Sequence, residues 1–122
     1  PPRSTLFPYT TLFRSIPGRF GGEEFIILFP GVRAVEARNA CDRIRVSVET
    51  APRPRGLEAA RITVSMGISD MYGSREDSEN RDGLDRLLSR ADEALYRAKS
   101  GGKNRCEIHP NSSGDKDPES GA

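Results

Sequence analysis

Two short stretches of the chain combine residue types that could carry phosphoryl-transfer chemistry. Residues 21–24 read Gly-Gly-Glu-Glu, so two carboxylates directly follow two glycines. Lys99 and Lys103 place two ammonium groups four residues apart, near the expected end of a helix. Carboxylates suit Mg²⁺, which prefers hard oxygen ligands, and cations neutralise phosphate charge. Because phosphoryl transfer depends mostly on positioning and charge neutralisation, the two stretches together favour that chemistry.

Each stretch also has a plainer interpretation when it is considered alone. Glu23 and Glu24 could be solvated side chains at a hairpin bend, although neighbouring glycines would let a phosphate or a base approach the backbone closely. Lys99 and Lys103 could simply interact with the dipole at the C-terminus of a helix. The presence of both stretches in one short chain favours the functional interpretation over these alternatives.

The residues around the two glycines predict a β-hairpin. Residues 16–20 form a short first strand, and a Gly-Gly turn follows, where positive φ costs little. Residues 25–29 are apolar at every position, which predicts a central strand buried on both faces. The two glutamates then lie at the bend of the hairpin.

The rest of the chain predicts a helix, a strand, a second helix and a closing strand. Residues 32–49 and 82–100 repeat with helical period; the second helix has an N-cap candidate in Asp82 and a Gly-Gly stop after it. Residues 61–69 alternate between apolar and small side chains, and residues 105–109 form the closing strand. The order predicts an α/β or α+β sheet with helices packed on it. The expected apolar faces comprise Ala37, Cys41, Ile44 and Val48; Ile62, Val64, Met66 and Ile68; and Leu84, Leu87, Leu88, Ala91, Leu95 and Ala98.

Composition narrows the functional classes. The 122 residues carry a net charge of +1, which argues against binding of nucleic acid or of an anionic membrane surface. A single histidine, His109, excludes a histidine-rich metal site. The two cysteines fit no metal or redox spacing, and Cys41 is expected to be a reduced core residue. A cytoplasmic protein without a membrane contact is the expectation.

The two ends of the chain lack this regularity. Residues 1–15 contain Thr-Leu-Phe twice and follow no helical or strand period. They resemble a translated sequencing adaptor more than a protein segment; the alternative is a genuine disordered tail. Residues 110–122 are polar and are expected to be disordered. One domain is therefore expected, over residues 16–109.

Three segments of this domain resemble the GGDEF domain family. Residues 18–25, GRFGGEEF, are similar to the family signature in its GGEEF form. Residues 62–69, ITVSMGIS, resemble the family's Ser-hydrophobe-Gly strand, and residues 91–105, ADEALYRAKSGGKNR, resemble its C-terminal helix and the following loop. The resemblance implies an α/β fold (an α+β sandwich), a nucleotidyl-cyclase-like palm with a central sheet of mixed, largely antiparallel strands. It also implies that the N-terminal part of the domain is missing.

The resemblance implies diguanylate cyclase activity, in which two GTP molecules on the two subunits of a homodimer condense into the bacterial second messenger cyclic di-GMP. By position, Gly21 and Gly22 would line the nucleotide. Glu23 would be a Mg²⁺ ligand. Glu24 would sit at the reacting centre, where the 3′-hydroxyl loses its proton. Such domains normally follow an upstream sensory or receiver domain, which this sequence does not identify.

The same resemblance assigns Lys99 and Lys103 to the β- and γ-phosphates of GTP. At the position of Lys103 the family usually has arginine, and lysine keeps the charge but loses the planar bidentate fork. The family's Arg-x-x-Asp product-inhibition motif would fall on Leu12 and Ser15, inside the irregular tail. A second metal-binding aspartate and the guanine-reading Asn and Asp of the family precede the first residue of this chain. The chain as given is therefore expected to make no cyclic di-GMP.

Two further functions remain open from the sequence. The main alternative is a degenerate GGDEF module that binds GTP or cyclic di-GMP without catalysis, although the intact Gly-Gly-Glu-Glu-Phe favours the enzyme. The other is a small ferredoxin-like nucleic-acid binder, which the near-zero net charge and the lack of an evident cluster of exposed aromatic residues do not favour.

Overall fold

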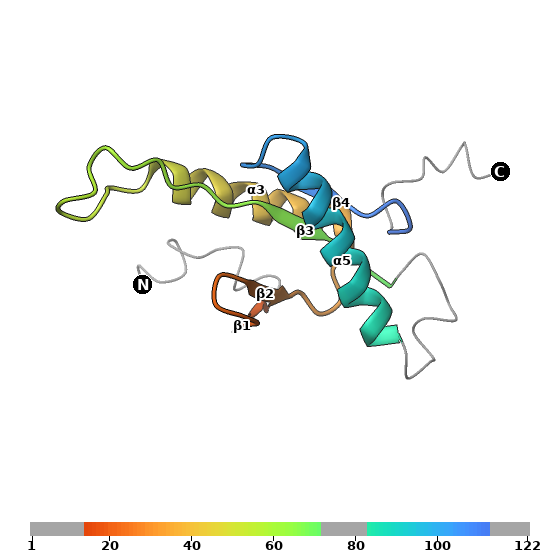
Figure 1. The fold of residues 1–122 in the computed structure, drawn as a ribbon. Helices are drawn as coiled ribbons and strands as arrows, with labels where there is room; N and C mark the ends of the chain where they lie inside the picture. Colours follow the sequence, from red (N-terminus) through yellow and green to blue (C-terminus); the bar gives the residue numbers. More distant parts are fainter. Residues whose placement is uncertain (1–13, 72–82, 113–122) are drawn as a thin grey trace. The chain divides into compact units, whose positions relative to one another are not determined.

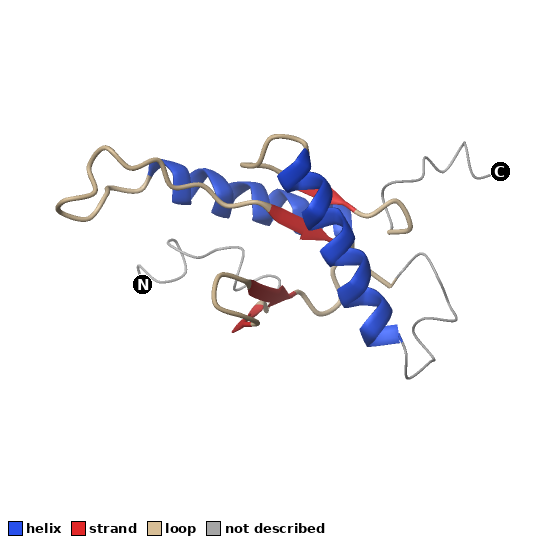
Figure 2. Cartoon of the chain, in the orientation of Figure 1, coloured by secondary structure: helices blue, strands red, loops and turns tan. Residues whose placement is uncertain are grey.

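The computed structural model describes residues 14–71 and 83–112, and the chain divides into two units, residues 1–32 and 33–122. The elements follow the order strand, strand, helix, strand, helix, strand (Figures 1 and 2). This order confirms the prediction from the sequence. The irregular residues 1–13, the N-cap candidate Asp82 and the tail after residue 112 lie outside the described residues.

The first unit contains a β-hairpin. Strands β1 (Ile16–Arg19) and β2 (Phe25–Leu28) pair antiparallel, with Ile16 opposite Leu28 and Arg19 opposite Phe25. The prediction that the second strand is buried on both faces is wrong: Phe25 is 73% exposed, and Ile26 and Ile27 are only half-buried. Within the described residues β1 is the only strand that pairs with β2, so the apolar run is an edge strand in the part of the sheet that the structure describes.

The second unit is a pair of strands with two helices packed on it. Strands β3 (Met66–Ile68) and β4 (Cys106–Ile108) are parallel, and both α3 (Ala34–Thr50) and α5 (Gly83–Ser100) contact both strands (Figure 1). The described strands therefore form two separate two-stranded sheets rather than one central sheet. The mixture of helices and strands is that of an α+β fold.

Strand β3 packs directly on α5 because residue 67 is glycine. A Cβ atom at Gly67 would lie 2.8 Å from Leu95 Cα and even closer to the Ala91 carbonyl oxygen and the Leu95 amide nitrogen. The small-residue face predicted for this segment thus has a structural role. The strand itself is shorter than the predicted residues 61–69, because only residues 66–68 have a partner strand in the described part of the chain.

Helix α3 has no side-chain cap from Arg33, the residue before its first turn. Instead, the buried Asp70 carboxylate accepts a hydrogen bond from the Ala34 amide at 2.6 Å, which satisfies one of the free amide groups of the helix start. The predicted apolar face is buried at Ala37 and Cys41. It is not buried at Ile44, which is 36% exposed, so the helix packs mainly through its first half.

Helix α5 packs through its small residues. Ala94 and Ala98 are fully buried, whereas Leu84 at the other end of the predicted apolar face is exposed. The packed part of the chain also extends to Ser112, three residues into the tail expected to be disordered. Ser112 is buried, and its hydroxyl accepts a hydrogen bond from the Asp70 amide at 3.1 Å.

Both cysteines lie in the interior of the second unit as free thiols, as predicted for Cys41. Burial, followed by the nearby Asp42 carboxylate, raises the pKa of the Cys41 thiol to about 11. Burial and a hydrogen bond with Asp42 raise the pKa of the Cys106 thiol to about 12. None of the helices in the described residues is long and apolar enough to cross a membrane.

Candidate functional site

The bend of the hairpin is a five-residue loop, residues 20–24, that is held by local hydrogen bonds. The Glu24 carbonyl accepts from the amides of Phe20 (2.9 Å) and Gly21 (3.2 Å). The Arg19 guanidinium reaches across the loop and donates to the carbonyls of Gly21 (3.2 Å) and Gly22 (3.0 Å). Every one of these contacts comes from within the hairpin itself.

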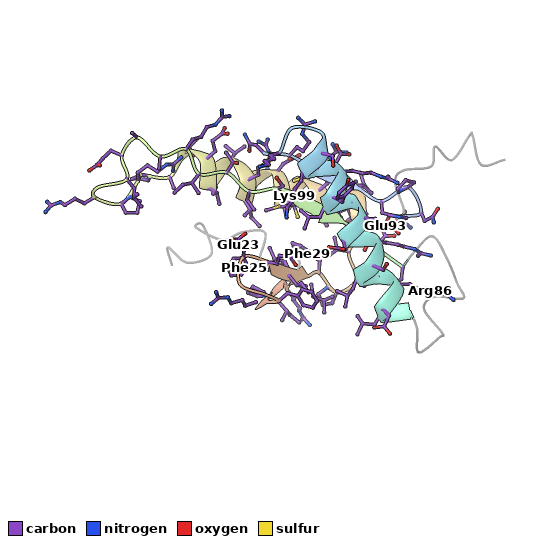
Figure 3. The ribbon with its side chains drawn as sticks, viewed as in Figure 1. Glu23, Phe25, Phe29, Arg86, Glu93 and Lys99 are labelled. Atoms are coloured by element: carbon purple, nitrogen blue, oxygen red, sulfur yellow. The ribbon has the colours of Figure 1, made fainter. Side chains whose placement is uncertain are left out.

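The side chains that the sequence singled out at this bend are exposed. Glu23, labelled in Figure 3, and Glu24 are both exposed. Their carboxylates have no hydrogen-bond or ion-pair partner among residues 14–71 and 83–112. The predicted turn is present, but it does not use the positive φ that glycine allows, because neither Gly21 nor Gly22 has a positive φ. A Cβ atom at either position would meet no atom within 4 Å. The glycines therefore serve no packing need within the described residues, and they leave the backbone open to a ligand.

The second predicted stretch forms the end of α5 and the loop after it. The Lys103 amide donates to the Ala98 carbonyl (2.9 Å), the Gly102 amide donates to the Lys99 carbonyl (3.4 Å), and Gly102 has φ +124°. This is the Schellman pattern that ends many helices at a glycine. Lys99 occupies the last turn of α5 (Figure 3). Lys103 lies in the loop, and both side chains are exposed.

The Arg105 side chain lies against the two glycines that follow the helix. Its Nε donates to the Lys103 carbonyl at 3.2 Å. A Cβ atom at Gly101 would lie 3.1 Å from Arg105 Nη1, and one at Gly102 would overlap Arg105 Nη2. The two glycines make room for this guanidinium, which in turn supports the loop that carries Lys103.

The sequence reasoning missed the residues that hold this loop from outside. Asn104 contacts Arg45 and Glu49 of α3 and Ser65, which precedes β3. The partners are 39 to 59 residues away along the chain, so no local pattern could reveal them. The sequence offered one indication of this contact, which is Asn104 itself, because it lies within the segment that resembles the family.

A shallow hollow of about 200 Å³ lies elsewhere in the second unit. It is lined by Arg86, Ser89, Arg90, Glu93, His109 and Asn111. The buried His109 places its Nε2 at 2.6 Å from Glu93 Oε2, while its Nδ1 accepts from the Asn111 amide at 3.1 Å. The pair therefore connects the residue that follows β4 to α5, and none of the residues predicted to act on a nucleotide lines the hollow.

The structure brings the predicted residues together in two groups. Gly21, Gly22, Glu23 and Glu24 share the hairpin bend of the first unit, and the two lysines share the end of α5 in the second unit. Within the described residues no three or more His, Cys, Asp or Glu side chains gather to hold a metal ion. Mg²⁺ is commonly held by one or two carboxylates together with substrate phosphates and water, so the oxygen donors of Glu23 and Glu24 fit part of such a site.

Comparison with known proteins agrees with the resemblance. The family model described as "Diguanylate cyclase, GGDEF domain" matches residues 11–105. The response regulator PleD of Caulobacter vibrioides is 36% identical over 91 residues, which are 73% of this chain and 19% of PleD. The diguanylate cyclase DgcM of Escherichia coli is 40% identical over 87 residues, 71% of this chain and 19% of DgcM.

A solved structure shows the same fold. The active GGEEF domain of a diguanylate cyclase from Vibrio cholerae superposes with a TM-score of 0.68 at 29% identity, and the match covers 87% of this chain and 63% of that one. The chain spans about a fifth of the length of the two curated relatives above. The family expected from the sequence is thus confirmed: this chain belongs to the GGDEF domain family of diguanylate cyclases.

Proposed function

We propose that the chain is the part of a diguanylate cyclase that supplies the metal-binding carboxylate and the phosphate-binding cations of the active site. The observation that carries the proposal is the hairpin bend, where two exposed carboxylates follow two glycines whose backbone is open to a ligand. Family membership supports the proposal, because the relatives include proteins named as diguanylate cyclases.

The hairpin residues take the following roles in this proposal. Gly21 and Gly22 allow the nucleotide to lie against the bare backbone of the bend. Glu23 holds Mg²⁺, which when bound neutralises charge on the reacting phosphates. Glu24 accepts the proton of the 3′-hydroxyl as that oxygen bonds to the α-phosphorus and the bond to pyrophosphate breaks. Cyclases of this family generally depend on a divalent metal, in line with a carboxylate in this place.

Lys99 and Lys103 bind the β- and γ-phosphates in the same proposal. Lys99 lies in the last turn of α5 and Lys103 in the loop that follows it, and both side chains are exposed. Lysine binds phosphate as a point charge, so Lys103 supplies charge without the bidentate geometry that an arginine would give. The ammonium groups stabilise the charge that builds up on the leaving pyrophosphate.

Two molecules are needed for the complete reaction. Each subunit of a homodimer binds one GTP, and each 3′-hydroxyl attacks the α-phosphate held by the other subunit. We infer that the protein works in the cytoplasm, where GTP is available, and that an upstream sensory or receiver domain controls the approach of the two subunits. The short matched share of PleD and DgcM is compatible with such additional domains.

The test is a chimera in which residues 16–109 replace the matched segment of PleD from Caulobacter vibrioides. The chimera is expected to form cyclic di-GMP from GTP and Mg²⁺, which chromatography can measure. Glu23→Gln in the chimera keeps the size of the side chain but removes the charge, so activity is expected to fall by roughly two orders of magnitude or more.

Glu36→Gln is the matched control, because Glu36 is an exposed glutamate in the first turn of α3, outside the proposed site. This variant is expected to keep the activity of the chimera. If Glu23→Gln turns over GTP at the rate of the chimera, the metal role is wrong. A chimera that binds GTP or cyclic di-GMP but forms no product would favour the non-catalytic module instead.

A further inference from the structure

Asn104 uses every polar group it has to bind residues outside its own loop. Its backbone amide donates to Ser65 Oγ at 3.2 Å, and its side-chain amide donates to Glu49 Oε2. Its side-chain oxygen and its backbone carbonyl both accept from Arg45 Nη1, at 3.0 and 3.4 Å. Asn104 is therefore fixed to helix α3 and to the segment that precedes β3.

The two α3 partners of Asn104 are themselves held in place. Arg45 Nε donates to Asp42 Oδ1 at 3.3 Å, and the Arg45 side chain is only 22% exposed. Arg61 Nη2 lies 3.8 Å from Glu49 Oε2. The planar guanidinium of Arg45 donates in two directions at once, to Asp42 and to Asn104, which a lysine ammonium cannot do with the same geometry. Arg45 thus acts as a rigid connection between α3 and the loop.

The backbone beside this connection has an uncommon conformation. Lys103 has φ 63° and Asn104 has φ 48°, so two successive residues other than glycine lie in the left-handed region. Such residues persist where the surrounding contacts enforce the conformation, and they cluster at ligand-binding sites. The side chain of Lys103 is exposed and takes no part in these contacts. The contacts of Asn104 therefore fix the backbone from which the Lys103 side chain extends.

We propose that Arg45 and Glu49 are positioning residues for Lys103: through Asn104 they hold the left-handed loop in the conformation that presents the ammonium group to a nucleoside triphosphate. The inference rests on the proposed function, since that function gives Lys103 its phosphate. A loop that is fixed before binding lowers the cost of ordering it when the triphosphate arrives. Loss of the connection therefore weakens triphosphate binding although neither residue touches the ligand.

The test compares nucleotide binding by the 122-residue chain and its variants, with GTP and GMP titrated in the presence of Mg²⁺ and followed by calorimetry. The chain is expected to bind GTP more tightly than GMP. Arg45→Lys is expected to lose about tenfold in GTP affinity, the scale of one charge-assisted hydrogen bond, with no change for GMP. If Arg45 acted only through its charge, Arg45→Lys would retain GTP affinity, and that result would overturn the proposal.

Two further variants separate a positioning role from a general one. Arg38→Lys makes the same substitution at an exposed arginine two turns earlier on α3, and it is expected to leave both affinities unchanged. Asn104→Gly keeps a backbone that accepts positive φ but removes the side chain that Arg45 and Glu49 hold. It is expected to match Arg45→Lys, and the double variant is expected to show no further loss. Additive losses would mean that Arg45 does not act through Asn104.

Amide hydrogen exchange provides a readout that does not need the ligand. In Arg45→Lys the amide of Asn104 is expected to exchange at least tenfold faster while the amides of β4 stay protected; general acceleration of both would indicate unfolding and contradict a local role. Glu49→Gln, a milder change, is expected to give a smaller acceleration at the same amide. No acceleration at Asn104 in either variant would overturn the proposal.

The variant Lys103→Gln tests the phosphate role of Lys103 separately from the positioning role of Arg45. If this variant lowers GTP affinity and Arg45→Lys does not, the positioning inference fails and the proposed function stands. If Lys103→Gln leaves GTP affinity unchanged, or if the chain shows no preference for GTP over GMP, the phosphate role of the lysine fails and the inference falls with it.

Discussion

The two loops that carry the proposed chemistry are built in opposite ways. Among the residues that the structure describes, the bend at residues 20–24 is held only by hydrogen bonds from within its own hairpin, and its glutamates are exposed. The loop at residues 101–105 is held by a Schellman motif, by Arg105 and by side chains from α3 and from the segment before β3. The lysine loop is thus fixed by contacts from other elements, whereas the described residues fix the carboxylate loop only from within its own hairpin.

The difference fits the roles proposed for the two loops. A loop that binds phosphate through flexible lysine side chains gains from a fixed backbone, because less freedom is lost on binding. A carboxylate that binds a metal can be ordered by the metal and the substrate phosphates together. The glycines reflect the same contrast: Gly67 and Gly102 have close neighbours, and Gly21 and Gly22 have none.

Among substitutions, the largest effect is expected where β3 packs against α5, the helix that leads into the lysine loop. Gly67→Ala would force a Cβ atom into the backbone of α5, and it is expected to lower the free energy of unfolding of the second unit by about 3 kcal/mol or more. Urea unfolding followed by circular dichroism measures the change. Gly22→Ala is the control, with an expected change within about 0.5 kcal/mol. Equal effects of the two substitutions would contradict the contrast between the loops.

Alkaline pH should loosen the second unit through its two buried thiols. An unfolded cysteine titrates at an ordinary pKa of 9.0, whereas burial raises the pKa of Cys41 to about 11 and that of Cys106 to about 12. Above pH 9 the unfolded chain therefore releases thiol protons that the folded chain retains, so the stability is full below pH 9 and falls as pH rises toward 11. The expected loss by pH 11 is on the order of 2 kcal/mol for each thiol, since each pKa unit corresponds to about 1.4 kcal/mol.

This pH dependence has a direct control in the variant with Cys41→Ala and Cys106→Ala. Its stability should fall less steeply than that of the parent chain between pH 9 and pH 11, whatever its stability at neutral pH. Parallel curves for the two proteins would show that other groups cause the alkaline loss. Because both cysteines lie in the second unit, the hairpin should not share the effect.

The smallest expected effect concerns the glycine that ends α5. Gly102→Ala places a side chain at φ +124° and against the Arg105 guanidinium, and it is expected to cost about 1–2 kcal/mol. Gly21→Ala is the counterpart in the hairpin bend and is expected to stay within about 0.5 kcal/mol. Thermal unfolding of the two variants measures the difference. An equal cost at the two positions would contradict the difference between the loop at residues 101–105 and the bend at residues 20–24.

The sequence predicted what local patterns determine. The hairpin, both helices and the strands around Gly67 and Cys106 follow from periodicity and turn residues, and both functional stretches were visible as residue types at close spacing. Burial was predicted poorly at Phe25 and Ile44, because it depends on neighbours that periodicity does not specify. The cap of α3 by Asp70 was not predictable for the same reason.

In the candidate site, too, the sequence predicted the local features and not the long-range contacts. Glu23 and the lysines were identified from the sequence, because charge and glycine content are local signals. The connection from Arg45 to Asn104 spans 59 residues of sequence and became visible only in the folded chain. It has no motif of its own, since an arginine on a helix ordinarily indicates nothing more than a solvated face.

The central claim is that the lysine loop is ordered before the nucleotide binds and the carboxylate loop is ordered by it, and residue-resolved amide hydrogen exchange tests this most directly. In the free chain, the amides of Lys103 and Asn104, which donate to Ala98 and Ser65, are expected to be protected. The amides of Gly22 and Glu23, which make no hydrogen bond within the described residues, are expected to exchange rapidly and to slow only with GTP and Mg²⁺. Rapid exchange at Asn104 in the free chain, or no slowing at Glu23 with the nucleotide, would contradict the account.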